Sequence, residues 1–191
     1  PCTQIKSLYH RSLTNVADQL DNALQAEKVL GIGLPVDDFI AQGYSKSNPV
    51  ALSYRTVCEM VVTGLGYTIK RSEARVEPAV LTQNLNIELM ERVIPAGDSV
   101  GSRIVSELET VQGVTARAQI DLRLCLPEET EHTYWDIEGT PRNSVRIDRS
   151  DSRHASPAIL FNRIPDVLAA PPGIVSINEL GPVRHSALLA L

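Results

Sequence analysis

The sequence has few aromatic residues, few cysteines and no long apolar run. Only 4% of its 191 residues are Phe, Trp or Tyr, so a core must be built mainly from aliphatic side chains. The three cysteines, Cys2, Cys58 and Cys125, lie far apart with no CxxC spacing, which favours free thiols in a reducing compartment. No run approaches the about 18 apolar residues that a membrane helix needs, and no signal peptide is visible. We therefore expect a cytoplasmic protein without a membrane partner.

The chain also lacks a surplus of positive charge. It has 18 Lys and Arg against 23 Asp and Glu, a formal net charge of −5. Proteins that bind nucleic acid need basic residues to neutralise phosphates, so no nucleic-acid partner is expected. The hydrophobic content of 43% is ordinary for a globular chain, and this length can bury a full core. We expect a single domain over residues 1–191, with residues 171–191 as a C-terminal tail.

Motifs that identify common chemistries are missing. There is no Walker loop, no HExxH, no GxSxG and no metal-like spacing of His and Cys. The stretch "GIGLPVDDF" at 31–39 has two glycines in the GxG pattern, but the third glycine of a dinucleotide turn is absent, and a helix-like segment precedes it. The sequence therefore predicts no metal site and no cofactor-binding residue in this chain.

The periodicity of the first part of the chain predicts one strand and then helices. Residues 4–12 alternate like a short strand, and residues 18–30 suit a helix that "GIG" ends. A short helix is expected from Pro35 to Gly43, and a longer one from Ser47 or Asn48 to Gly64 or Gly66. The longer helix has apolar residues three and four apart: Val50, Tyr54, Val57, Val61 and Leu65.

From Tyr67 onward, extended segments dominate. Strands are expected in 67–82, 86–97, 101–110, 114–126, 132–141 and 143–148. In 114–126, apolar residues alternate with polar ones, which predicts a strand covered on one face only. A last helix is expected from about Ser156 to Leu168, and Pro171-Pro172-Gly173 ends it. This order predicts an α+β fold with a mixed, largely antiparallel sheet of about five to six strands, covered on one face by helices.

Spacing alone names no mechanism, although several polar residues are candidates. The four histidines are dispersed; His10 lies on the first strand between Tyr9 and Arg11. Glu77 precedes a proline in an extended strand, so its carboxylate has a fixed direction, although a solvated strand face accounts for it equally well.

Six stretches, in one order along nearly the whole chain, resemble a known family. They are "GIGLPVDDF", "YRTVCEMVVTGLGY", "RVEPAV", "VIPAGDSVGSR", "EGTP" and "FNRIPDVLAAPPGIVSINEL". They resemble the C-terminal part of the dihydrodipicolinate-reductase-like oxidoreductases, in the branch of 2,4-diaminopentanoate dehydrogenase and the amine dehydrogenases. The last stretch is the most specific of the six.

The resemblance implies a substrate-binding and dimerisation domain. In that family an N-terminal Rossmann domain binds NAD(P)H, and the C-terminal domain supplies the substrate pocket and dimer contacts through its sheet. No Rossmann domain is found in these 191 residues, so the chain alone is expected to bind no nicotinamide. Tyr9, His10 and Glu77 are the catalytic candidates that follow, and Arg11, His154 and Asn162 the substrate-binding candidates.

Three functions remain open. The first is the substrate domain of an NAD(P)H-dependent oxidoreductase for an amine, imine or amino-acid-like substrate, working as a homodimer or higher homo-oligomer. The second is a Rossmann-less enzyme for redox-neutral chemistry, such as a cyclase, isomerase or dehydratase, with an acid/base pair drawn from Tyr9, His10, Glu77 or His154. The third is a non-enzymatic small-molecule binder or structural dimer.

Overall fold

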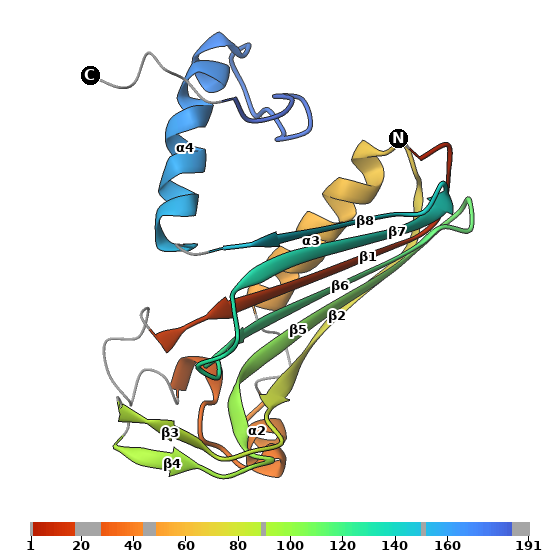
Figure 1. Cartoon of the computed structure of the whole chain (residues 1–191). Helices are drawn as coiled ribbons and strands as arrows, with labels where there is room; N and C mark the ends of the chain where they lie inside the picture. The colour runs from red at the N-terminus through yellow and green to blue at the C-terminus, as the bar shows by residue number, and fades with distance from the viewer. Residues whose placement is uncertain (1, 18–27, 44–48, 89–90, 150–151, 185–191) are drawn as a thin grey trace. The chain divides into compact units, whose positions relative to one another are not determined.

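A computed structural model of the chain describes residues 2–17, 28–43, 49–88, 91–149 and 152–184 (Figure 1). The chain divides into two compact units, Pro1–Arg149 and Ser150–Leu191, and each is described here by itself. The expected single domain stays a prediction, because two compact units can belong to one domain.

The first unit is built on a six-stranded sheet. Its strands, in spatial order, are β2 (Ile69–Val80), β5 (Ser99–Thr110), β6 (Thr115–Arg123), β1 (Gln4–Asn15), β7 (His132–Thr140) and β8 (Asn143–Asp148). Every neighbouring pair is antiparallel except β1 and β6, which run parallel. The predicted α+β fold with a mixed, largely antiparallel sheet is confirmed.

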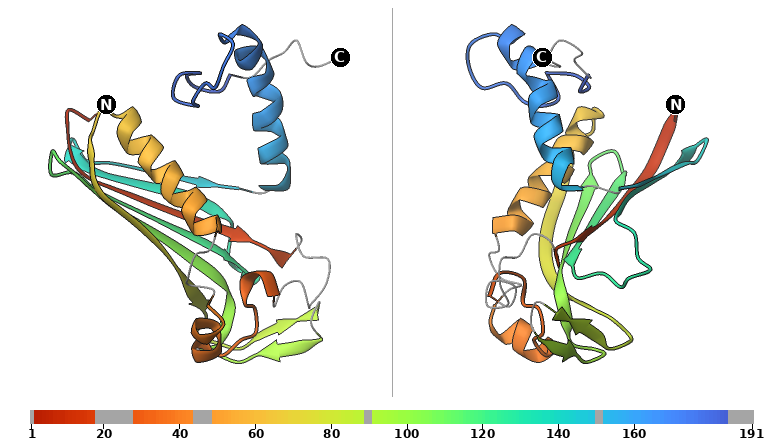
Figure 2. Two further views of the ribbon diagram at one scale, coloured as in Figure 1. Left: turned by 180° about the vertical axis from the view of Figure 1, so that it is seen from behind. Right: turned by 60° about the vertical axis from the view of Figure 1, so that its left-hand side comes forward.

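Helix α3 (Pro49–Gly64) packs against β2, β5 and β6 on one face of the sheet (Figure 2). We call this the helix face. It includes the buried residues Leu8, Val76, Ile104, Ala116 and Ile120, which lie in register across neighbouring strands. The opposite face, called the polar face, carries charged side chains from the alternate positions of the same strands. The alternation predicted for β6 is confirmed from Thr115 to Ile120, but beyond it Asp121 and Arg123 on the polar face are buried as well.

The predicted apolar stripe of α3 is confirmed in part: Tyr54 packs against a buried cluster, but the residues of the stripe are not the most buried ones of this segment. Ala51 and Val62 are its buried apolar residues, whereas Val57 and Leu65 are half exposed. The side chain of Val50 lies outside the described residues.

A two-stranded hairpin replaces the single extended segment expected at 86–97. Strands β3 (Leu85–Ile87) and β4 (Arg92–Ile94) pair antiparallel, and Glu91 between them has a positive φ of 48°. The hairpin lies at the same end of the sheet as the short helix α2 (Val36–Ala41) (Figure 1). Its residues Leu85, Ile87 and Ile94 join a buried cluster with Val100 and Leu124. Of the helix expected at 18–30, only residues 28–30 are described, and they are helical.

The second unit contains α4 (Ser152–Ala169), which starts earlier than expected and has Pro157 and Pro165 inside it. The helix ends before Pro171, so the predicted stop is confirmed. The tail after it is not extended: the Ser176 backbone N–H donates to the Glu179 carboxylate at 2.6 Å, and a turn forms there. Ile174 is fully exposed.

Candidate functional site

Strand β1 distributes the three adjacent candidates Tyr9, His10 and Arg11 over both faces of the sheet. Side chains alternate along a strand, so His10 lies on the helix face while Tyr9 and Arg11 lie on the polar face. Within the sheet, His10 is in register with Ala118 on β6 and with Trp135 on β7.

His10 lines an apolar cavity of about 130 Å³ between α3 and the sheet. The polar or reactive residues that line it are His10, Tyr54, Cys58 and Arg117, and the single tryptophan of the chain, Trp135, forms part of it. The His10 and Trp135 rings are in contact, with centroids 4.4 Å apart and planes tilted by 48°. The rest of the wall is aliphatic, including Val57 and Val61 of the predicted α3 stripe.

The cavity favours the neutral forms of its titratable groups. Burial lowers the pKa of His10, and the nearby positive charge of Arg149 lowers it further. Burial raises the pKa of Tyr54, an effect that Arg149 partly opposes. Burial and the charge of Glu59 raise the pKa of the Cys58 thiol. Near neutral pH the wall therefore presents an imidazole that can accept a proton and a phenol that can donate one.

Arg149 sits at the edge of this region. Its Nη2 donates to the Leu13 carbonyl at 2.8 Å and to the hydroxyls of Ser12 and Thr14 at 3.2 Å. Ser12 is the next residue after His10 on the helix face of β1, since side chains alternate. These contacts keep the guanidinium close to the cavity.

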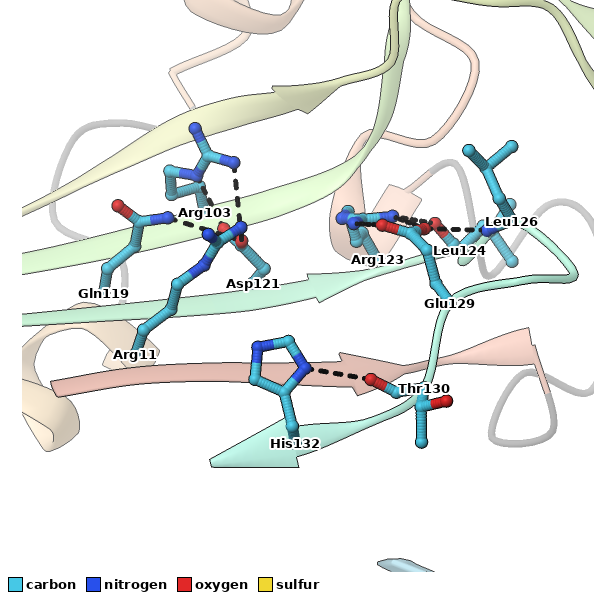
Figure 3. Close-up of polar contacts among 10 residues, drawn as sticks. All are labelled: Arg11, Arg103, Gln119, Asp121, Arg123, Leu124, Leu126, Glu129, Thr130 and His132. Carbon is cyan, nitrogen blue, oxygen red and sulfur yellow. Dashed lines mark hydrogen bonds and ion pairs between the residues drawn. The ribbon is translucent and has the colours of Figure 1, made fainter. Parts of the chain in front are cut away.

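On the polar face, Arg11 binds a buried carboxylate. Arg11 and Arg103 both contact Asp121, whose side chain has no exposed surface; the Arg103 Nε lies 2.6 Å from it and the Arg11 Nη2 3.4 Å (Figure 3). Gln119 donates to the same carboxylate at 3.4 Å. Arg11 is thus placed on the face opposite the cavity, with an internal partner.

The structure does not bring Glu77 near His10. Glu77 lies on β2, three strands away from β1, and on the polar face, where the Arg75 Nε donates to it at 2.7 Å. Arg75 also contacts Glu107, which in turn contacts Arg117. Tyr9 lines a separate open depression of about 390 Å³ on the polar face, together with Glu107 and Arg117. An acid/base pair of His10 and Glu77 does not match this geometry.

The candidates His154 and Asn162 belong to α4 in the second unit. His154 is exposed and Asn162 is half buried, and both have interaction partners. Their role in binding substrate stays a prediction.

Two searches within the described residues gave negative results. The described ranges contain no group of three His, Cys, Asp or Glu side chains arranged for a metal ion. Among the helices described, none is both long and apolar enough to cross a membrane.

The fold has a known counterpart. No family model and no curated protein matches the chain. The solved structure of an amine dehydrogenase from Mycobacterium smegmatis is similar to it, with a TM-score of 0.79 and 25% sequence identity. The fold is amine-dehydrogenase-like. The match covers 97% of this chain and 54% of that chain, so the chain spans about half the length of the amine dehydrogenase.

Sequence reasoning missed four residues of the cavity region: Tyr54, Cys58, Trp135 and Arg149. The sequence predicts Tyr54 only as part of the apolar stripe of α3, and Cys58 only as a free thiol. The presence of a single tryptophan in an aromatic-poor chain was a usable signal for Trp135. Arg149 had no such signal, because its contacts with β1 join residues more than 130 positions apart.

Proposed function

We propose that this chain is the substrate-binding and dimerisation domain of an NAD(P)H-dependent oxidoreductase acting on an amine, imine or amino-acid-like substrate. The observation that carries the proposal is the likeness to an amine dehydrogenase over 97% of the chain. That likeness supports an oxidoreductase-related function, and the substrate and cofactor are part of the proposal.

The apolar cavity is the proposed substrate pocket. An apolar wall excludes water and disfavours charged ligands, so it suits a neutral carbonyl or imine group. The neutral phenol of Tyr54 would donate a hydrogen bond to the oxygen or nitrogen of that group. The neutral imidazole of His10 would accept one from the substrate amine. Both residues would thereby orient the reacting carbon.

The cavity between α3 and the sheet is too small for a dinucleotide. A cavity of about 130 Å³ lies below the roughly 300 Å³ at which pockets for drug-sized ligands begin. We therefore propose that a separate nucleotide-binding domain holds the nicotinamide. The second unit supports such a partner, since Leu160, Phe161, Leu168 and Ile174 expose large apolar side chains that a neighbouring domain would cover.

The polar face is the proposed surface for a homodimer or higher oligomer. Arg75, Glu107 and Arg117 alternate in charge across neighbouring strands. Such an arrangement can pair with a second copy of itself. A cytoplasmic location belongs to the same proposal and is supported by three free cysteines.

Ligand binding at Trp135 tests the proposal, because this single tryptophan reports on the cavity alone. We expect short aliphatic ketones and amines to change its fluorescence in a saturable way. Ala118→Leu, which adds volume at the cavity wall, should abolish the change. Ala79→Leu enlarges a fully buried residue of another cluster, so it controls for overpacking as such. A wild-type chain that responds to no member of the series would contradict the proposal.

Titration with NADH and NADPH completes the test. The chain alone should leave nicotinamide fluorescence unchanged, since the nucleotide site is proposed to lie outside it. Saturable binding of either cofactor by this chain would refute that part of the proposal.

A redox-neutral enzyme is the second candidate, and one observation favours it. His10 and Tyr54 line one cavity with a proton-accepting imidazole and a proton-donating phenol, a pair that can move protons without a nicotinamide. The test is whether the purified chain converts a ligand without any cofactor. Activity that is lost in both His10→Gln and Tyr54→Phe would favour this candidate over the first.

A further inference from the structure

The six-stranded sheet has two edge strands, and their outer edges differ. Strand β2 contains Pro78, and its register with β5 shifts at two points; prolines and bulges of this kind discourage a further strand from pairing. Strand β8 contains no proline, and its register with β7 is continuous. Residues 144–148 are exposed, and among the described strands β8 pairs with β7 alone (Figure 1). The outer edge of β8 is therefore the one at which the sheet can accept another strand.

One backbone hydrogen bond shows which groups of β8 point outward. Directly after β8, the Arg149 N–H donates to the Glu131 carbonyl at 2.8 Å. In an antiparallel pair, hydrogen-bonded and non-hydrogen-bonded positions alternate along each strand. The odd-numbered residues of β8 therefore bond to β7, whereas the N–H and C=O groups of Ser144, Arg146 and Asp148 point away from it. An added strand would bond to β8 at these three residues.

The side chains at these positions fit a second copy of β8. Two copies related by a two-fold axis pair antiparallel, and the outward residues of one must face those of the other. With the axis at Val145, Ser144 comes opposite Arg146 of the second copy. Asp148 comes opposite the exposed Arg142 of that copy, which places opposite charges together. Val145, now 53% exposed, then meets its own copy, and both apolar side chains lose contact with water.

Other alignments of the two strands are less favourable. An axis at Arg146 would set two guanidinium groups directly opposite each other, which is destabilising. Axes closer to either end of β8 would pair less of the strand. An axis between two residues would place outward groups of one copy opposite the groups that bond to β7 in the other. The strand therefore favours the alignment at Val145.

We propose that the outer edge of β8 is an interaction surface for a second copy of this chain. The two β8 strands pair antiparallel about Val145 and join the two six-stranded sheets edge to edge. This inference goes beyond the proposed function. It uses backbone groups at an edge of the sheet, whereas the contact proposed for the polar face uses charged side chains.

Introduced cysteines test the alignment. In a non-hydrogen-bonded pair at the axis, the Cα atoms of the two Val145 residues lie about 4.5 Å apart, which a disulfide can span. We expect Val145→Cys to form a cross-linked dimer under mild oxidation, measured by intact mass and located by peptide mass. Ile147→Cys is the matched control, because the two Ile147 residues would lie about 13 Å apart along the strands, too far for a disulfide. The wild type, with Cys2, Cys58 and Cys125, gives the background.

A proline tests the backbone hydrogen bonds of the same contact. Ser144→Pro removes an outward N–H and leaves the hydrogen bonds to β7 in place, whereas Ser144→Ala keeps that N–H. At high protein concentration, we expect sedimentation equilibrium to give the wild type and Ser144→Ala about twice the apparent mass of Ser144→Pro. Circular dichroism and Trp135 emission show whether each variant is folded. If Ser144→Pro fails to fold, the cysteine variants still decide.

The outcomes separate this contact from the proposed function. A cross-link in Val145→Cys that does not exceed the wild-type background, or one that is equally efficient in Ile147→Cys, would overturn the inference. Equal apparent masses of folded Ser144→Pro and Ser144→Ala would overturn it as well. Oligomers that form through the polar face alone leave the edges of β8 unpaired, so they give no link at Val145. Ligand binding in the cavity is measured independently of all these variants.

Discussion

His10 takes its chemical character from the side chains around its ring. Trp135 lies against it on β7, while Tyr54 and Cys58 on α3 and Arg149 at the end of β8 are the titratable or charged groups around it. None of these neighbours carries a negative charge near neutral pH, so nothing compensates an imidazolium at this position. A histidine on the polar face would lie among carboxylates, whose negative charges favour the protonated imidazolium.

This environment predicts how stability depends on pH. The pKa of His10 is lowered in the folded chain, so between its unfolded pKa of about 6.5 and its folded pKa the unfolded state binds a proton that the folded state does not. The contribution of His10 is therefore present above about pH 6.5 and is lost as the pH falls through its folded pKa. We expect the free energy of unfolding, measured with urea, to fall more between pH 7.5 and pH 5 for the wild type than for His10→Gln. His132→Gln changes a histidine on the polar face and should behave like the wild type.

At the level of elements, the polar face holds its strands together through charge. Asp121 on β6 joins Arg103 on β5 to Arg11 on β1, so one carboxylate spans three neighbouring strands. At the end of β6, Arg123 contacts Glu129 at 2.5 Å, and Glu129 also accepts the Leu126 backbone N–H at 2.8 Å (Figure 3). The loop after β6 is thereby fixed to the strand.

Asp121→Asn tests the first of these links. Removing the charge leaves two arginines beside a neutral amide, which should lower the free energy of unfolding by about 3 kcal/mol. Glu73→Gln is the control: Glu73 contacts Arg71 at 2.8 Å on the same face, but both are exposed, so the loss should stay below about 1 kcal/mol. Urea unfolding of both variants measures the difference. Equal decreases in the free energy of unfolding for the two variants would mean that burial of the Asp121 carboxylate does not strengthen its contribution to stability.

The elements differ in how far the sequence could predict them. The alternation in β6 and the proline stop after α4 are local signals; the stop appears in the structure as expected, and the alternation does so up to Ile120. The parallel pairing of β1 with β6 leaves no local signal, because it joins residues about 108 positions apart, as Leu8 and Ala116 show. For the same reason the sequence pointed to His10 as a candidate but not to Arg149 beside it.

At the level of the whole molecule, the first unit contains its own core. All three buried clusters are made of residues from Pro1–Arg149, including Phe39, Val62 and Ile104. The apolar residues of α4 in the second unit are exposed, among them Leu160 and Leu168. The first unit therefore has what a stable fold needs without the second.

Truncation after Arg149 tests this independence. A chain of residues 1–149 should unfold cooperatively, with a melting temperature within a few degrees of that of the full chain. Its Trp135 emission maximum should be unchanged, because the cavity is formed within the first unit. A truncated chain that lacks a cooperative transition would show that the second unit contributes to the core.

The place of β1 in the sheet has a consequence for biosynthesis. His10 pairs with Trp135, so the ribosome must add 125 further residues after His10 before its partner exists. At about 5–20 residues per second this takes roughly 6–25 s. One edge of the strand that carries His10 can pair with β6 once Ala118 has been translated, whereas the edge that faces β7 stays unpaired until Trp135 follows. The strand that is translated first is thus among the last to be paired, and the cavity forms only when translation of the sheet is nearly complete.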